Sequence, residues 1–219
     1  MRNRVVLNVA TGRYVRGQAR LKSLLNGVDF LGWTDEMPPG SPTHGEVPYA
    51  FKSWAIQEAK RRGYTSILWA DACIYPAPDL SPLWERIERD GCWISNNGWL
   101  NGQWCSDAAL PLFGMTREEA MEQKHVVATS FALNLAHPVG QQIAAEYHRF
   151  ACNGSFFGPW SNKNGEASSD SRVLGHRHDQ TALSVIAHRM GLELTDPPAW
   201  FAYRGGEIPS TCLIADGSY

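Results

Sequence analysis

An apolar run, Ile67 to Ala70, ends at the carboxylate of Asp71. A short run of this kind predicts a buried strand, and ligands of open α/β sheets bind outside the carboxyl ends of the strands. A carboxylate at that place can hold a ribose hydroxyl or a divalent cation that bridges to phosphate oxygens. The competing interpretation is that Asp71 only caps the following turn, as aspartate often does.

A second group of reactive side chains comes late in the chain, where His176, Arg177, His178 and Asp179 follow one another. Histidine and aspartate can ligate a metal or accept a proton, and arginine binds phosphate. Asp179 also stands where the N-cap of a helix over Thr181–Met190 is expected, and free N–H groups at a helix start can hold an anion. The sequence leaves the chemical and the structural role of this group equally open.

An aromatic stretch contains Trp93, Trp99 and Trp104 with asparagine and glutamine between them. Tryptophan faces combined with amide side chains suit sugar rings or bases, through stacking and hydrogen bonds. Packing under a long loop is the commoner role of such residues.

Alternating strands and helices must position these residues. Predicted strands cover Val5–Ala10, Asp29–Trp33, Thr65–Ala70, Cys92–Ser95 and Val126–Leu135, and predicted helices cover Tyr14–Leu25, Tyr49–Arg62, Ser81–Arg89, a short segment from Thr116, Pro138–Phe150 and Thr181–Met190. Glu36–Pro48 and Asn153–Gly175 are predicted loops, and Asn96–Phe113 is expected to be irregular. This order predicts an α/β Rossmann-type layer fold with a mostly parallel central sheet flanked by helices.

The predicted helix over Tyr49–Arg62 carries Lys52, Lys60, Arg61 and Arg62. From the residues alone, a charged helix face of this kind is expected to be solvated. Isolated histidines such as His44 are given no role.

The composition excludes several classes of protein. The chain has 219 residues, 43% of them hydrophobic and 19% charged, which is typical of one soluble globular domain. A formal net charge of −2 excludes a strongly basic nucleic-acid coat and a polybasic membrane anchor. The five cysteines are scattered without a CxxC pair, and no apolar stretch is long enough to span a bilayer, so we expect a cytoplasmic protein with reduced thiols and no transmembrane segment. Motifs of P-loop, dinucleotide-binding, serine-hydrolase and zinc-protease sites are missing from the sequence.

Taken together, the segments resemble the GT-A-type nucleotide-sugar glycosyltransferases over roughly residues 3 to 194. The strand Val5–Ala10, the helix with Lys52 and the strand ending at Asp71 resemble the nucleotide-binding half of that family. The strand Val126–Leu135 and the segment His178-Asp179-Gln180 resemble its acceptor half. The resemblance implies a single GT-A-like domain over 1–219, with a nucleotide-binding half at 1–95, an acceptor half at 96–194 and a closing tail at 195–219.

The resemblance also implies roles for individual residues. Asp71 matches the first acid of the family's DxD motif, and Thr11, Tyr14 and Lys52 would contact the nucleotide, the first two near the base and Lys52 near ribose or phosphate. Asp179 would be the acid on the acceptor side and a candidate base for the acceptor hydroxyl. The acceptor would lie beneath the aromatic stretch, against Trp99 and Trp104, and beneath the long Asn153–Gly175 loop.

A divalent cation, Mn²⁺ or Mg²⁺, is the cofactor that the resemblance implies, with Asp71 and either His178 or Asp179 as candidate ligands. Cys73 departs from the family pattern because it stands where the second acid of the DxD motif is expected. A thiol is a poor ligand for Mg²⁺. Basic side chains such as Lys52 and Arg177 are therefore the alternative means of stabilising a diphosphate leaving group.

The predicted function is sugar transfer from a nucleotide-sugar donor, UDP-sugar above all, to an acceptor hydroxyl. A saccharide, a protein and a hydroxylated base in DNA, as in phage modification enzymes, all remain open as acceptors. Two other classes are kept as alternatives. One is a non-catalytic nucleotide- or sugar-binding module with a decayed motif, and the other is a metal-dependent hydrolase that uses His176, His178 and Asp71.

Overall fold

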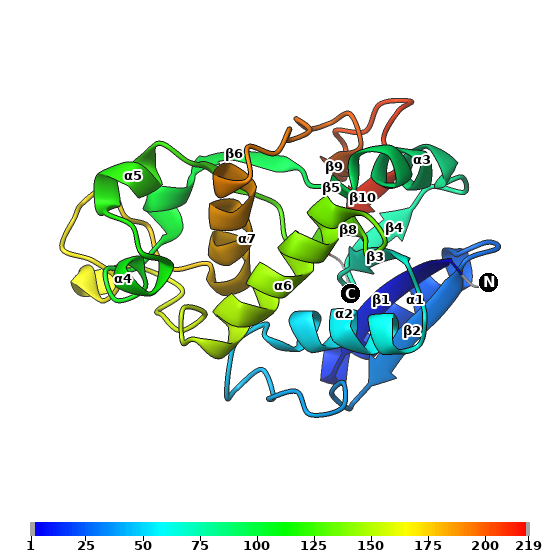
Figure 1. Cartoon of the computed structure of the whole chain (residues 1–219), viewed down its shortest axis with the longest axis horizontal. Helices are drawn as coiled ribbons and strands as arrows, with labels where there is room; N and C mark the ends of the chain where they lie inside the picture. Colours follow the sequence, from blue (N-terminus) through cyan, green and yellow to red (C-terminus); the bar gives the residue numbers. More distant parts are fainter. Residues whose placement is uncertain (1–2, 218–219) are drawn as a thin grey trace.

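The computed structural model describes residues 3–217, and its centre is a sheet of five strands in the order β2-β1-β3-β8-β5 (Figure 1). The strands are β1 (Arg4–Ala10), β2 (Asp29–Thr34), β3 (Ser66–Ala70), β5 (Cys92–Trp93) and β8 (Ser130–Asn134). β1 runs parallel to β2 and β3, whereas β8 runs antiparallel to both of its neighbours. Four of the five strands therefore point the same way, which confirms the predicted α/β fold with a mostly parallel sheet.

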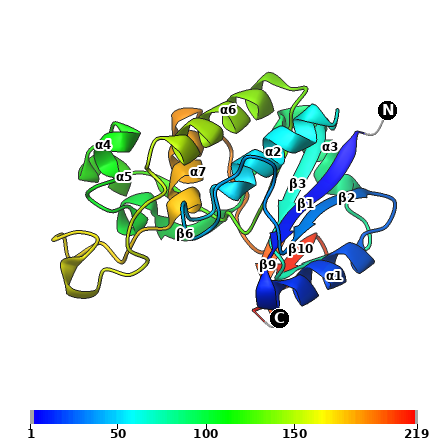
Figure 2. The same cartoon turned by 90° about the horizontal axis from the view of Figure 1, so that it is seen from below.

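Helices cover both faces of this sheet. α2 (Phe51–Arg61) and α6 (Pro138–Cys152) lie on one face, and α7 (His178–Arg189) packs against α6 (Figure 2). α1 (Val15–Leu24), which follows a short 3-10 turn η1 (Gly12–Tyr14), and α3 (Ser81–Asp90) share the core of the other face. All five helices were predicted, four from their apolar spacing and α3 from its capping residues, with ends that differ by no more than three residues.

β3 is the middle strand of the sheet, and its side chains are buried on both faces. Ile67 and Trp69 pack into the core on the α2 and α6 side. Leu68 and Ala70 pack into the core on the α1 and α3 side. A strand buried in this way has an unbroken apolar sequence, which is the pattern that predicted a central strand.

The segment between the sheet and α7 is more ordered than predicted. It contains β6 (Asn96–Leu100), η2 (Asn101–Trp104), α4 (Leu110–Phe113), α5 (Arg117–Met121) and β7 (Lys124–Val126), and β6 pairs with β7. The expectation that 96–113 is irregular is therefore wrong. Polar contacts between distant residues order it: the buried Asn101 donates to Gln123 Oε1 at 3.0 Å and lies 3.0 Å from His125 Nδ1. Such contacts leave no periodic pattern in the sequence.

The single strand predicted over 126–135 is also wrong, because β7 and β8 are two strands of different sheets. Between them the backbone serves the site described below: Thr129 O accepts a hydrogen bond from Asp71 N at 2.9 Å. The capping box predicted at Thr116 is confirmed, since its hydroxyl accepts from Glu119 N.

The last two strands lie beside the turn that follows β3. β9 (Phe201–Tyr203) and β10 (Leu213–Ala215) form a small sheet with β4 (Ile74–Pro76), in the order β4-β10-β9. Asp216 N then donates to Cys73 O at 3.0 Å. A last 3-10 turn, η3 (Lys163–Gly165), lies within the long loop 153–175. The division into two functional halves and a tail stays a prediction. None of the helices between residues 3 and 217 has the length and apolar character needed to cross a membrane.

Candidate functional site

Asp71 follows the last residue of β3, at the edge of the sheet where β1 also ends, as the sequence predicts. Trp69 Nε1 donates to its Oδ1 at 2.7 Å, and its own backbone N–H donates to Thr129 O. The Asp71 side chain is 30% exposed. The carboxylate is therefore held in a fixed orientation and is still reachable by a ligand.

Lys52 is buried beside this carboxylate, with only 2% of its side chain exposed. Its Nζ donates to Ala128 O at 2.8 Å and lies 2.9 Å from Asp179 Oδ2 and 3.4 Å from Asp71 Oδ1. The expectation of a solvated side chain is wrong for Lys52, although Lys60 on the same helix is exposed. The reason is position: Lys52 is in the first turn of α2, from which its ammonium group reaches the backbone oxygen of Ala128.

The charge of Lys52 is fixed by its two acidic neighbours. Burial by itself lowers the pKa of Lys52, but the carboxylates of Asp179 and Asp71 outweigh burial and raise the pKa above its ordinary value. Lys52 is therefore a permanent cation that joins two carboxylates from different elements.

Asp179 lies in the first turn of α7 and is 5% exposed. The structure does not place it at the N-cap, as the sequence had suggested, because the helix begins at His178 with Arg177 as its N-cap. The hydroxyl of Tyr147, on α6, donates to Asp179 Oδ2 at 3.2 Å. Burial, reinforced by the charge of Asp179, raises the pKa of Tyr147 well above its ordinary value, so Tyr147 keeps this proton.

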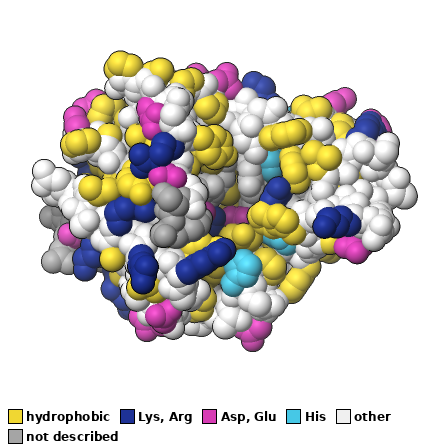
Figure 3. Space-filling model, turned by 180° about the vertical axis from the view of Figure 1, so that it is seen from behind, with side chains coloured by type: hydrophobic (Ala, Val, Ile, Leu, Met, Phe, Trp, Pro, Cys, Tyr) yellow, Lys and Arg dark blue, Asp and Glu magenta, His cyan; other side chains and the backbone are white. Residues whose placement is uncertain are grey.

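Two cavities meet at this cluster. The larger, of about 350 Å³, is lined by Val9, Thr11, Tyr14, Met37, His44, Tyr49, Phe51, Asp71 and Ala72. The smaller, of about 80 Å³, is lined by Tyr49, Lys52, Asp71, Ala128, Thr129, Trp160, Arg177, Asp179 and Gln180. Tyr49 and Asp71 belong to both, so the cavities adjoin at the carboxylate. In the space-filling view, acidic, basic and histidine side chains gather around a hollow between the two halves of the molecule (Figure 3).

The larger cavity brings together Thr11, Tyr14 and Asp71 from the predicted nucleotide-binding set, and Lys52 lies just behind it in the smaller one. His44, Tyr49 and Phe51 also belong to this region and were not predicted. Burial raises the pKa of Tyr49 to about 12, and burial lowers the pKa of His44, so both side chains are neutral at physiological pH. The larger cavity is therefore lined by aromatic, apolar and hydroxyl side chains, and Asp71 is the charged residue among them.

Arg177 supplies a positive charge on the other side of the cluster. Its guanidinium carbon lies 4.2 Å from the ring centre of Trp104 and 3.9 Å from that of Trp160. Stacking on aromatic rings fixes a guanidinium plane and leaves its N–H edges available for an oxyanion. Arg177 is thus oriented by two tryptophans at the wall of the smaller cavity.

Three residues around the site have backbone angles that side chains other than glycine rarely adopt. Asp35, Tyr49 and His178 have φ values of +55°, +60° and +47°. Asp35 Oδ1 accepts from Gly12 N at 2.7 Å and so holds the loop between β1 and α1, while Tyr49 lines both cavities. Strained backbone of this kind gathers at functional sites, because the surrounding structure must hold it in place.

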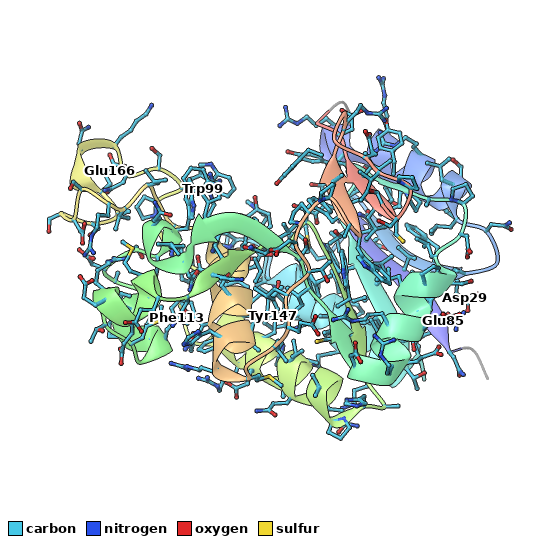
Figure 4. All side chains as sticks on the ribbon, turned by 90° about the horizontal axis from the view of Figure 1, so that it is seen from above. Asp29, Glu85, Trp99, Phe113, Tyr147 and Glu166 are labelled. Atoms are coloured by element: carbon cyan, nitrogen blue, oxygen red, sulfur yellow. The ribbon has the colours of Figure 1, made fainter. Side chains whose placement is uncertain are left out.

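Trp99 and Trp104, predicted to bind the acceptor, form an edge-to-face pair with ring centres 5.8 Å apart. Trp99 is 48% exposed, on β6, and lies near the 153–175 loop that carries Glu166 (Figure 4). Trp104 instead holds Arg177 on its ring, and its backbone oxygen accepts from Thr181 Oγ1 at 2.6 Å. Of the two, Trp99 is the one whose face can meet a ligand directly.

The two histidines of the late cluster have backbone partners. His176 Nδ1 accepts from Ser106 N at 3.2 Å, so its Nε2–H donates to Ser155 O at 2.9 Å, and neither ring nitrogen can ligate a metal. His178 Nδ1 donates to Phe156 O at 2.7 Å, and His178 lines neither cavity. The hydrolase alternative needs His176 as a ligand, and the structure gives it no support.

The residues near Asp71 do not fit a Mn²⁺ or Mg²⁺ site. Burial raises the pKa of the Cys73 thiol to about 12, so it is not a thiolate at neutral pH. Within residues 3–217, no three histidine, cysteine, aspartate or glutamate side chains cluster so that they could hold a metal ion. Hard divalent cations require several oxygen ligands, and Asp71 shares its Oδ1 with Trp69 and Lys52.

The residues that sequence reasoning missed have one thing in common. Tyr147, Trp160 and Tyr49 reach the site from a helix face, a long loop and a strained turn, and each reads as ordinary packing or loop in the sequence. Only the functional expectation for the long 153–175 loop pointed toward Trp160.

Comparison with known proteins identifies the fold. No protein-family model matches the chain, and no curated protein sequence matches it. Among solved structures, a glycosyltransferase involved in glycosylation of the major capsid of PBCV-1 superposes with a TM-score of 0.58 at 12% identity, covering 99% of this chain and 94% of that one. Mouse xyloside xylosyltransferase 1 superposes with a TM-score of 0.56 at 10% identity, covering 98% of each chain.

The bifunctional glycosyltransferase WbbM gives a TM-score of 0.55 at 10% identity over 99% of this chain and 46% of its own. The chain therefore has the fold of glycosyltransferases, in agreement with the GT-A-type resemblance of its sequence.

Proposed function

We propose that this protein transfers a sugar from a nucleotide-sugar donor to an acceptor hydroxyl. The observation that carries the proposal is the buried cluster of Asp71, Lys52 and Asp179, which lies where two cavities meet at the carboxyl end of the central sheet. A cavity on each side of a pair of carboxylates suits a reaction that joins two substrates. The glycosyltransferase fold supports the same conclusion.

The larger cavity takes the nucleoside part of the donor. Its aromatic wall, with Tyr14, Tyr49 and Phe51, suits a base, and the Thr11 hydroxyl and the Asp71 carboxylate suit the base edge and the ribose hydroxyls. UDP is the nucleotide that the sequence resemblance favours. The diphosphate then lies near Asp71, and the N–H edges of Arg177 face it from the smaller cavity.

In the reaction, the bond between the sugar C1 and the diphosphate oxygen breaks, and the leaving diphosphate keeps the electron pair. A new bond forms between C1 and the acceptor oxygen, and the hydroxyl proton passes to a carboxylate. Asp179 is the proposed base that accepts this proton, because it lines the smaller cavity and Lys52 and Tyr147 orient its carboxylate. Arg177 stabilises the negative charge that develops on the diphosphate.

A saccharide is the acceptor that the aromatic side chains favour. Trp99 and Trp160 are each about half exposed, at 48% and 52%, and Trp160 lines the smaller cavity. Exposed tryptophan faces suit the apolar face of a sugar ring, and that of Trp160 lies in the cavity that Asp179 lines. Acceptor bases in DNA would instead make transfer fall steeply with salt, since phosphate contacts release counterions.

The first test is a thermal-shift panel with UDP, GDP, CMP and TDP. A ligand present at about a hundred times its Kd adds about 2.7 kcal/mol of stability, which for a chain of this size is a rise in Tm of about 5–10 °C. We expect a selective rise with one nucleotide. The absence of a rise with all of them would contradict the proposal.

The second test is turnover, measured as nucleoside diphosphate released from the matching nucleotide-sugar in the presence of a panel of saccharides. Asp71→Asn is expected to abolish transfer and keep the fold, while Glu85→Gln, an exposed acid on α3, is the control and keeps full activity. Nucleotide binding without turnover by the unaltered protein would favour the non-catalytic binding module instead.

A further inference from the structure

The carboxylates that would hold a divalent cation already share a cation of the protein's own. An ammonium group has three protons to donate, and Lys52 Nζ has three oxygen neighbours: Asp179 Oδ2, Asp71 Oδ1 and Ala128 O, at 2.9, 3.4 and 2.8 Å. Asp71 and Asp179 are thus neutralised in part from inside the protein. A metal ion at the same carboxylates would have to displace or repel this buried charge.

The position two residues after Asp71 offers no second ligand. Cys73 packs against the apolar core on the α1 and α3 side and lines neither cavity. The acid that follows the last strand, Asp216, lies near Cys73 through its backbone, but its carboxylate forms an ion pair with Arg204. Neither residue adds an available oxygen beside Asp71.

Further positive charge surrounds the same turn. Arg20 Nη2 donates to Ala72 O at 2.7 Å, and its guanidinium carbon lies 3.7 Å from the ring centre of Tyr75. Arg204 lies over the same ring, at 4.5 Å. Arg20 behind the turn and Arg177 at the wall of the smaller cavity thus add positive charge to that of Lys52, whereas the charge of Arg204 is balanced by Asp216. This added charge disfavours a divalent cation and favours an anionic ligand.

Resting on the proposed function, we propose that this protein binds its nucleotide diphosphate without a divalent cation. Lys52 serves as the fixed counter-ion of Asp71 and Asp179, and Arg177 contacts the diphosphate. Lys52 is a positioning residue, since its three protons go to protein oxygens, and Arg177 is the cation that touches the ligand.

The experiment is isothermal titration of the unaltered protein with UDP, and with GDP, CMP and TDP, once in EDTA and once in excess MnCl₂. We expect the bound nucleotide to have Kd values in the two buffers that agree within about threefold. Binding in MnCl₂ alone would overturn this inference and leave the proposed function standing. Failure of every nucleotide in both buffers would overturn the proposed function, and this inference with it.

Direct measurement of metal binding tests the same idea. The EPR signal of free Mn²⁺ should fall no further when the unaltered protein is added to the nucleotide than it does with the nucleotide alone, because the site offers a divalent cation too few oxygen ligands. An additional loss of the signal that needs both the protein and the nucleotide would overturn the inference.

Discussion

The variant Lys52→Met keeps an unbranched side chain of similar length and removes its charge, so that Asp71 and Asp179 face each other without the cation between them. Removing one partner of a buried ion pair costs about 3–5 kcal/mol, because the remaining charge is left without compensation. Lys52 and Asp179 are 2% and 5% exposed, but Asp71 is 30% exposed and solvent screens part of its charge. We therefore expect a loss near the lower end of that range, about 3 kcal/mol.

Urea unfolding followed by tryptophan fluorescence measures this loss. With a slope of about 3 kcal/mol/M, the upper end for small proteins, the midpoint should fall by about 1 M. Lys60→Met is the control, because Lys60 is exposed on the same helix and its removal should cost less than about 0.5 kcal/mol. The double variant Lys52→Met with Asp179→Asn should regain part of the loss, since it removes one of the uncompensated charges.

The pH dependence of this loss has a defined sign. Burial by itself lowers the pKa of Lys52, but Asp179 and Asp71 raise this pKa above its ordinary value in the folded protein. A cation whose pKa is raised by folding contributes its full stabilisation below its unfolded pKa, which is about 10.4 for lysine. This stabilisation is lost only as the pH rises through the pKa of the folded state. The difference between the unaltered protein and Lys52→Met should thus be constant from about pH 7.5 to about pH 9.5. A Lys52→Met midpoint equal to that of Lys60→Met would refute the buried ion cluster.

Three further variants test the other parts of the site. Tyr147→Phe removes a buried hydrogen bond, so it should lower kcat and also lower the free energy of unfolding by about 1 kcal/mol. Its control is Tyr64→Phe, which loses a half-buried hydroxyl contact away from the site and should lower stability alone. Arg177→Met loses a charge-assisted contact and should raise the Kd of the nucleoside diphosphate at least about tenfold. Its control is Arg149→Met, which also removes an arginine stacked on an aromatic ring and should leave that Kd unchanged. Trp99→Ala should raise KM for the saccharide acceptor several-fold, with nucleotide Kd unchanged in the same protein; an unchanged acceptor KM would exclude Trp99 from acceptor binding.

The parts of the fold that could be predicted are those with a local signal. The strand ending at Asp71 has an unbroken apolar sequence, and α2 and α6 have apolar residues at helical spacing, so their positions follow from the sequence. β6 and η2 have no such signal, because side-chain contacts such as that of Asn101 with Gln123 stabilise them. Propensity is a weak guide where tertiary contacts decide.

The candidate site shows the same division at the level of single residues. The sequence placed Asp71 at a strand end and grouped Arg177, His178 and Asp179, but it had no means of pairing Lys52 with Asp179 across 127 positions of the chain. An isolated lysine in a helix is normally exposed. The burial of Lys52 depends on Asp71 and Asp179 from two other elements, and the tertiary structure alone brings these residues together.

This dependence couples the stability of the protein to its proposed chemistry. α2, the end of β3 and α7 each bring one charge to the cluster, and each charge is balanced in part by the others. Neutralising one acid for catalytic study therefore also changes the balance that keeps Lys52 buried, so kcat and unfolding free energy must be measured on the same variants. A loss of transfer in Asp71→Asn with unchanged stability would assign the carboxylate to the reaction, whereas parallel losses would assign it to the folding of the cluster.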